Sequence, residues 1–201
     1  MIHKYSLYSL NKLKSIKSAL FLITLNHYIN KKYFLIIIIL FSFTSEQNEI
    51  SLTIEGTGQL NFINEAFNLC PYEVYVNYDK KDNSFKSYDF EKSLNNVKIK
   101  FNNKIGTCQS MFEGLLNIIE IDLSNFDASE VTSMASMFNS CINLKKITFG
   151  NMKTSSVKNM EFLFYNCTKL FSIDLSNFDT SSVITMNHMF SHCESLLSLD
   201  D

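Results

Sequence analysis

The chain has 201 residues, of which 46% are hydrophobic and 19% charged, and this balance is typical of a folding sequence rather than a disordered one. The formal net charge of −2 divides unevenly, because residues 1–45 carry six Lys and no acidic residue, whereas the rest carries 12 Lys against 20 acidic residues. The acidic body and the absence of Arg argue against DNA or RNA binding, so we expect no nucleic-acid partner.

The first 45 residues have the parts of a secretory signal. Lys31 and Lys32 precede an apolar run, Tyr33–Phe41, and small residues follow it. The run is shorter than the ~20 apolar residues that a bilayer span requires, although residues 20–25 form a second, weaker patch. We therefore predict a cleaved signal peptide, a mature chain that begins near Glu46, and a secreted or cell-surface location. Two alternatives remain, namely an uncleaved signal anchor, which would be the only part of the chain in a membrane, and a buried element of a cytosolic protein.

Residues 46–104 alternate apolar and polar side chains, which is typical of strands. Ile50, Leu52 and Ile54 alternate in one segment, and the same pattern recurs near residues 74–76 and 97–101. The polar run Asp79–Asn83 predicts a turn. An array of repeats exposes apolar surface at its end, and a different terminal unit is needed to cover it. We therefore predict that these residues form a small β-rich N-terminal cap. An independent ligand-binding domain is the alternative.

From residue 105 to residue 201 a sequence motif recurs every 26 residues. Three full units (Ile105–Glu130, Val131–Ser156 and Val157–Ser182) precede an incomplete one (Val183–Asp201). A period of this length predicts an array in which each unit buries its apolar side against its neighbours. The residues that recur in register, and that we expect in the core, are Phe112, Phe138, Phe164, Phe190, Cys141, Cys167 and Cys193.

The second unit shows what each part of the repeat is expected to form. Its apolar residues from Val131 to Leu144 are spaced three, three, one, three and three apart, which predicts one face of a helix. Asp127 and Ser129 precede that stretch, where they would cap the helix. Ile147 and the residues around it alternate, which predicts a short strand. The predicted fold class is therefore α/β, a leucine-rich-repeat-like solenoid of about four coils with short parallel strands and helices.

The run Ile173–Val183, with the Met-Phe pair and the Cys that follow it, resembles the 26-residue surface-protein repeat of bacteria and unicellular eukaryotes. This repeat belongs to the BspA-like branch of the leucine-rich-repeat solenoids. The resemblance implies a secreted or surface-exposed protein that acts in adhesion or protein binding, without enzymatic activity. The departures from the pattern are Cys108 and Leu115 in the first unit and Thr148, Gly150, Met152 and Lys153 in the second.

One outward strand position recurs as a candidate binding face. It is occupied by Asp122, Thr148, Asp174 and Asp200. A calcium ladder is conceivable there, but Thr148 interrupts the acids and no Gly-rich Asp loop accompanies them. We interpret the position as a solvated face that meets a partner.

The remaining candidate residues predict no metal site and no cofactor. One Cys per unit lacks the pairing of a zinc site, so buried apolar thiols are expected. His188 and His192 lie four residues apart, as a pair of zinc ligands would, but the sequence offers no third ligand. We therefore expect both side chains in solvent. Asn166 begins a glycosylation sequon beside Cys167. If the chain is secreted, a disulfide between Cys70 and Cys108 is an alternative to two free thiols.

No nucleophile–base pair, phosphate-binding loop or nucleotide fingerprint occurs in the sequence. We therefore expect a non-enzymatic, secreted or cell-surface repeat protein whose partner is a protein or another cell-surface ligand. An enzyme or sensor with its activity in residues 46–104 or in further C-terminal sequence is the second hypothesis, and an intracellular interaction scaffold is the third. Because the fourth unit stops before its corner, further repeats or self-association through that end are also expected.

Overall fold

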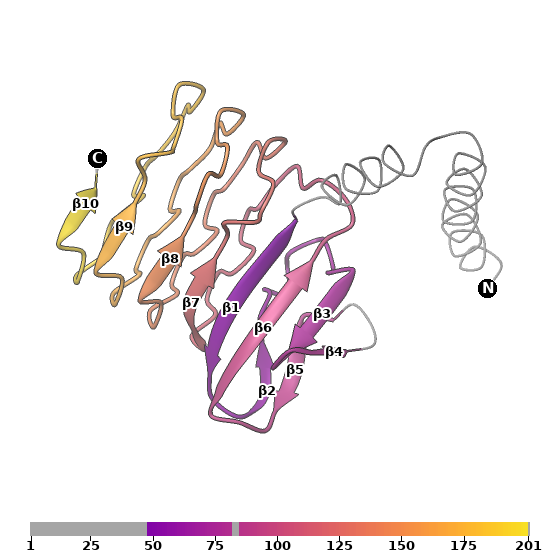
Figure 1. Ribbon diagram of the computed structural model, residues 1–201. Coiled ribbons are helices and arrows are strands. Elements are labelled where there is room, and N and C mark those ends of the chain that lie inside the picture. The colour runs from indigo at the N-terminus through magenta and orange to yellow at the C-terminus, as the bar shows by residue number, and fades with distance from the viewer. Residues whose placement is uncertain (1–47, 82–84, 201) are drawn as a thin grey trace, which may run out of the picture. The chain divides into compact units, whose positions relative to one another are not determined.

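A computed structural model of the chain describes residues 48–81 and 85–200 (Figure 1). These residues lie in one compact unit, Gln47–Asp201. The predicted signal segment at residues 1–45 falls outside the described residues. Within the described part, no helix is long and apolar enough to cross a membrane.

A mixed six-stranded sheet runs from the section before the repeats into the first two units (Figure 1). Its order is β4-β3-β6-β1-β7-β8, and every neighbouring pair is antiparallel except β7 and β8, which are parallel. The strands are β1 (Glu49–Glu55), β3 (Glu73–Val76), β4 (Asp79–Lys81), β6 (Leu94–Lys100), β7 (Ile118–Asp122) and β8 (Lys146–Thr148).

Two small sheets complete the described structure. The antiparallel pair consists of β2 (Gly58–Asn61) and β5 (Ser87–Phe90). The parallel pair consists of β9 (Ser172–Asp174) and β10 (Ser198–Asp200) in the third and fourth units. Figure 1 shows β7, β8, β9 and β10 side by side, so the 26-residue units follow one another along one direction.

Alternation of side chains explains why the strands before the repeats form where they do. In β1, Ile50, Leu52 and Ile54 are buried, whereas Ser51 and Thr53 between them are only partly covered. The inward side chains of these strands share one hydrophobic core with those of the repeats. The turn predicted at Asp79–Asn83 is wrong in part, because Asp79–Lys81 forms β4 and the turn lies just before it.

The predicted α/β solenoid is wrong, since residues 48–81 and 85–200 contain strands and turns but no helix, and the large sheet is mixed. The stretch Val131–Leu144, which has the apolar spacing of a helix, is a run of turns. Ser136 and Ser140 have φ values of 55° and 60°, a left-handed conformation that an α-helix excludes. Local hydrogen bonds span three residues, as from the Met137 N–H to the Met134 carbonyl at 3.1 Å.

Hydrogen bonds between units replace the bonds that a helix would make within itself. In the second unit, alternate N–H groups donate to carbonyls of the third unit at 2.8–3.0 Å; the donors are Met134, Ser136, Phe138 and Ser140, and the acceptors Asn159, Glu161, Leu163 and Tyr165. The expected helix caps close short turns instead, because Asp127 Oδ1 accepts the Ser129 N–H at 3.0 Å. An apolar step of three residues suits either arrangement, and periodicity alone does not separate the two.

The recurring Phe side chains form a column through the units. Phe112, Phe138 and Phe164 are fully buried, and Phe190 is partly buried. Successive rings stack in nearly parallel planes, with centroids 5.8, 5.5 and 5.3 Å apart along the column. Each unit therefore buries its aromatic ring only because the next unit supplies another.

The recurring thiols form a second column, and each one reaches back to the unit before it. The Sγ of Cys141 donates to the Phe112 carbonyl at 3.0 Å, and Cys167 and Cys193 repeat this contact at 3.1 and 3.0 Å. The first unit has no preceding unit to supply such a carbonyl, which accounts for Leu115 at the Cys position.

Burial controls the chemistry of these thiols. It raises the pKa of Cys141 to about 12 and also raises the pKa of Cys167 and of Cys193. All five cysteines are free thiols, with Cys70 exposed and Cys108 buried, so the structure contains no disulfide between these two.

In the folded protein we expect Cys141 and Cys167 to react with iodoacetamide at least about 100-fold more slowly than Cys70, because the thiolate is the reactive form and burial suppresses it. Cys70 is the internal control, since the same sample reports both rates by mass spectrometry. Equal rates for the exposed and buried thiols under native conditions would contradict the packing of the thiol column.

A candidate binding face on the six-stranded sheet

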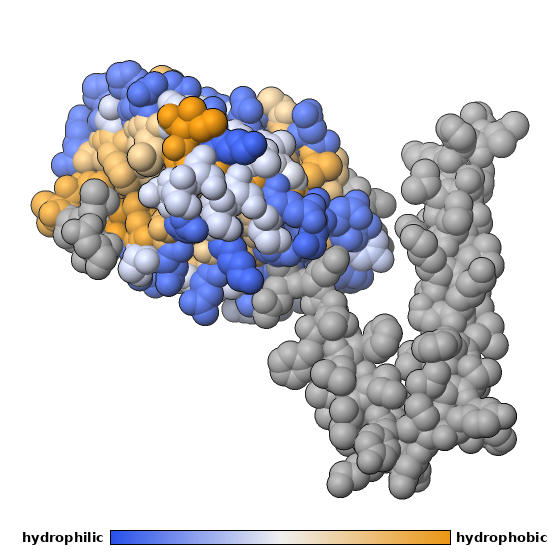
Figure 2. Space-filling model, turned by 90° about the horizontal axis from the view of Figure 1, so that it is seen from above, coloured by the Kyte–Doolittle hydropathy of each residue, from blue (hydrophilic) through white to orange (hydrophobic). Residues whose placement is uncertain are grey.

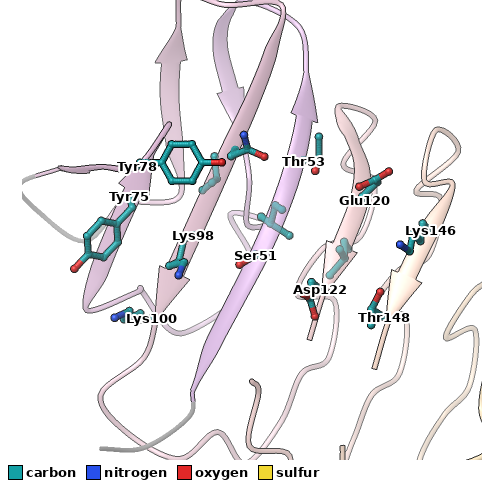
Figure 3. Close-up of a pocket in the computed structure, with 14 residues that line it drawn as sticks. Ser51, Thr53, Tyr75, Tyr78, Lys98, Lys100, Glu120, Asp122, Lys146 and Thr148 are labelled. Carbon is teal, nitrogen blue, oxygen red and sulfur yellow. The ribbon is translucent and has the colours of Figure 1, made fainter. Parts of the chain in front are cut away.

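The outward face of the six-stranded sheet is hollowed into a concavity of about 620 Å³ (Figure 3). Strands β1, β3, β6, β7 and β8 and the turn after β3 supply its lining. The residues that line it are Ser51, Leu52, Thr53, Tyr75, Tyr78, Asn96, Val97, Lys98, Lys100, Glu120, Ile121, Asp122, Lys146 and Thr148.

Strand register arranges the polar side chains of this face in rows. Ser51 pairs with Lys98 on one side and Asp122 on the other, and Asp122 pairs in turn with Thr148. Figure 3 shows this row crossing the face, with Tyr75 and Tyr78 on one side and Thr148 on the other. The face therefore combines aromatic rings, hydroxyl groups and charges of both signs.

The lysines on one side of the face are paired with glutamates. Lys98 Nζ lies 2.7 Å from Glu49, and Lys100 Nζ lies 3.6 Å from Glu49 and 4.0 Å from Glu73. Hydrogen bonds from Lys80 and from the Tyr75 hydroxyl hold the pKa of Glu73 below its ordinary value. Exposed ion pairs of this kind contribute little stability, but they leave this side of the face without a strong positive field.

Tyr78 occupies an unusual position at the edge of the concavity. Asn77 and Tyr78 form the two-residue turn between β3 and β4, with φ values of 50° and 74°. Such a turn requires left-handed conformations at both residues, and it suits Asn or Gly but not a bulky ring. The Tyr78 residue is nevertheless 86% exposed, so no packing of the ring explains its presence.

The turn that carries Tyr78 is fastened to β6. Asn77 Nδ2 donates to the side chain of the buried Asn95 at 3.0 Å, and Asn77 Oδ1 accepts the Asn96 N–H at 3.0 Å. Asn95 in turn donates to the Lys92 carbonyl at 2.6 Å. The exposed ring is thus held on a rigid support beside the concavity.

The binding face expected from the repeats lies partly in this concavity. Asp122 and Thr148 line it, whereas Asp174 is exposed on β9 and Asp200 belongs to β10, directly opposite Asp174. The acids also close turns: Asp122 Oδ1 accepts the Ser124 N–H at 2.9 Å. The hydroxyl and N–H of Ser176 bind Asp174 in the same way and hold the pKa of that carboxyl below its usual range.

The other candidates stand apart from the concavity. His188 stacks on Phe162 and His192 meets the edge of Tyr165, with ring centroids 5.1 Å apart in both pairs. Across residues 48–81 and 85–200, no three His, Cys, Asp or Glu side chains gather as metal ligands would. Asn166 lies among the turns of the third unit with a φ of 57°, and its side-chain amide donates to the Ser140 hydroxyl at 3.4 Å.

Sequence reasoning missed the contribution of residues before the repeats to this face. Ser51, Thr53, Tyr75 and Lys98 occupy the outward positions of the alternating segments, so the pattern contained the signal once the strands were known to pair with β7. Tyr78 could not be singled out, because the sequence predicts the turn at Asp79–Asn83, whereas the turn lies at Asn77 and Tyr78.

These features define an all-β protein with 26-residue repeats joined to an antiparallel sheet. The family described as "Mycoplasma protein of unknown function, DUF285" matches residues 80–199, more than half of the chain. The chain therefore belongs to the DUF285 family. No curated protein and no solved structure matches it.

Proposed function

We propose that the chain is a non-enzymatic repeat protein of the cell exterior, and that the outward face of its six-stranded sheet binds a protein or another cell-surface ligand. The observation that carries the proposal is Tyr78, an exposed ring in a left-handed turn beside the concavity. Strained residues persist where the surrounding structure holds them, and they cluster at binding sites. Exposed aromatic residues are also the side chains that dominate binding energy at interfaces.

The sequence supports the location. Lys31 and Lys32, the apolar run after them and the small residues that follow are the parts of an export signal. The 26-residue sequence repeat resembles the BspA-like surface repeats, whose suggested roles are adhesion and protein binding. The mixed and partly neutralised charges of the face fit a polar macromolecular ligand better than DNA, RNA or an anionic membrane, which attract a concentrated positive patch.

Replacement of Tyr78 separates binding from folding. In Tyr78→Gly the left-handed turn is relaxed, so the free energy of unfolding should stay the same or rise by up to ~1 kcal/mol. Binding of the labelled protein to intact cells should fall at least roughly tenfold, as expected for an aromatic interface anchor. Flow cytometry with a concentration series measures the binding, and a denaturant titration measures the stability.

Tyr72→Ala is the matched control, because Tyr72 is also an exposed tyrosine but does not line the concavity. It should leave cell binding unchanged. Unchanged binding by Tyr78→Gly, or the absence of saturable binding by the unaltered chain, would contradict the proposal.

A further inference from the structure

The polar side chains of the concavity form two parallel rows that cross the sheet (Figure 3). Strand register sets both rows, and Tyr78 joins the second because the N–H of Asn77 beside it donates to the Asn96 carbonyl at 2.8 Å. In order, the first row contains Tyr75, Lys98, Ser51, Asp122 and Thr148, and the second contains Tyr78, Asn96, Thr53, Glu120 and Lys146. Each row therefore passes from a tyrosine through a nitrogen donor and a hydroxyl to a carboxylate.

The length and the position of the rows restrict the ligand. Neighbouring strands lie about 4.8 Å apart, so the first row, which crosses from β3 to β8 through β6, β1 and β7, extends roughly 19 Å. A ligand that meets both ends of this row is an oligomer of several units. In the middle, β1 is paired with both β6 and β7, so a peptide strand cannot add to the sheet there. Recognition of the ligand therefore falls to the side chains.

Among the described residues that line the concavity, no aliphatic side chain is exposed. Leu52, Val97 and Ile121 face the core, with exposed fractions of 2%, 1% and 1%. Hydrophobic surface lies elsewhere, since Figure 2 shows it gathered at the end of the molecule where the last unit lies. The buried centre of a protein–protein interface is normally apolar and poor in charged residues. The centre of this face has hydroxyls and carboxylates instead, so it suits a protein partner poorly.

The charges of the face largely cancel. Three lysines of the lining stand against four carboxylates in or beside it; the lysines are Lys98, Lys100 and Lys146, and the carboxylates are Glu49, Glu73, Glu120 and Asp122. Glu120 and Lys146 are direct cross-strand partners, and the other two lysines are held by ion pairs. A ligand with a strong charge of either sign would meet repulsion as well as attraction, so the face suits a neutral ligand.

The middle of each row offers groups that match the hydroxyls of a sugar. The hydroxyl of Ser51 lies beside its cross-strand partner Asp122, and Thr53 forms the equivalent pair in the second row. A hydroxyl donates and accepts hydrogen bonds, whereas a carboxylate only accepts them, so each pair can bind adjacent sugar hydroxyls. Asp122 Oδ1 accepts the Ser124 N–H at 2.9 Å, which fixes the carboxylate and leaves its second oxygen for the ligand.

The two tyrosines supply flat apolar surfaces on one side of the face. Tyr75 is fixed, since its hydroxyl donates to Glu73 at 2.9 Å and Lys100 Nζ lies 5.4 Å from the centre of its ring. Tyr78 extends into solvent from its fastened turn. A sugar ring has a face of C–H groups and an edge of hydroxyls. Aromatic side chains accept such a face, while polar side chains beside them bind the edge.

We propose that this face binds a neutral oligosaccharide. The inference rests on the proposed function, which assigns ligand binding to the face, and it adds the chemical class of the ligand. One sugar ring packs on Tyr78. The units that follow cross the sheet, where the pair of Ser51 and Asp122 and the pair of Thr53 and Glu120 bind their hydroxyls.

Competition with purified sugars tests the inference on cells that bind the labelled chain. Oligosaccharides are released from those cells, freed of protein, and divided by anion exchange into a neutral and an acidic fraction. The neutral fraction should compete for binding in flow cytometry, and the acidic fraction should not. Binding should also stay constant between about 0.1 M and about 1 M NaCl, because salt does not screen the contacts of a neutral ligand.

Asp122→Asn tests the carboxylate at the centre of the face. The amide oxygen can still accept the Ser124 N–H, whereas the second acceptor oxygen becomes an NH₂ donor. Binding to the cells should fall at least roughly tenfold, as expected for the loss of a hydrogen bond to a charged group. Asp179→Asn is the matched control, since Asp179 Oδ1 accepts the Ser181 N–H at 3.0 Å in the same way but lies outside the concavity. It should leave binding unchanged.

The outcomes separate this inference from the proposed function. If Tyr78→Gly lowers cell binding but the neutral fraction does not compete, the oligosaccharide assignment falls alone; the ligand is then an acidic sugar if the acidic fraction competes, and a protein if neither fraction does. Equal binding by Asp122→Asn and Asp179→Asn would also overturn the assignment. If the unaltered chain shows no saturable binding to cells, the proposed function fails as well.

Discussion

Phe164→Ala is expected to lower the free energy of unfolding by about 3–5 kcal/mol, as core aromatic truncations do. The Phe164 ring is fully buried, it stacks on Phe138 and Phe190, and it meets the edge of Phe149 at 6.2 Å. The substitution leaves a void in the middle of the column, and the units on either side cannot close it without breaking the four hydrogen bonds at each junction.

Phe171→Ala in the same unit is the matched control. That residue is 53% exposed, so its truncation should cost less than ~1 kcal/mol. Chemical denaturation of both variants with a common slope compares them directly. A loss below ~1 kcal/mol for Phe164→Ala would mean that the column of rings does not hold the units together.

Gly150→Ala is expected to destabilise the protein by about 2–4 kcal/mol, through left-handed strain together with a steric clash. Gly150 has a φ of 58°, and an added Cβ would lie 2.9 Å from the Cα of Ser124 in the preceding unit. Backbone cannot yield as the tip of a side chain can. Gly150 stands where the first and third units have Ser124 and Ser176, and it lies in the same unit as Thr148, which replaces the turn-closing Asp of those two units.

Gly114→Ala isolates the strain from the clash. Gly114 also has a positive φ, of 71°, but an added Cβ meets nothing within 4 Å. It should therefore cost only about 1 kcal/mol. Thermal and denaturant unfolding of the pair gives the difference, and equal losses would show that the close approach between units at Ser124 is not rigid.

The sequence could predict strands but not the class of the fold. Ile50, Leu52 and Ile54 alternate because one side of β1 faces the core, and this local rule holds wherever a strand is half buried. Helix and turn could not be separated in Val131–Leu144. The left-handed conformations of Ser136 and Ser140 are stabilised by hydrogen bonds to residues 25 positions away, and no local pattern contains that information.

The candidate site was predictable only in part for a similar reason. Asp122 and Thr148 were found because they recur with the repeat. Lys98 and Ser51 join them through the pairing of β1 with β6 and β7, which is a long-range event. Tyr78 was not predictable in this way, because its place in the turn follows only once Asp79 is known to begin β4 and to pair with Val76.

The measurement that tests the proposed function most directly is the N-terminal sequence of the mature protein, taken together with the fraction in which it is recovered. Binding by the sheet face to an exterior ligand requires residues 48–201 to be exported. We predict a chain that begins near Glu46 and is recovered from the medium or the cell envelope. An intact Met1 on a protein confined to the cytosol would contradict the account.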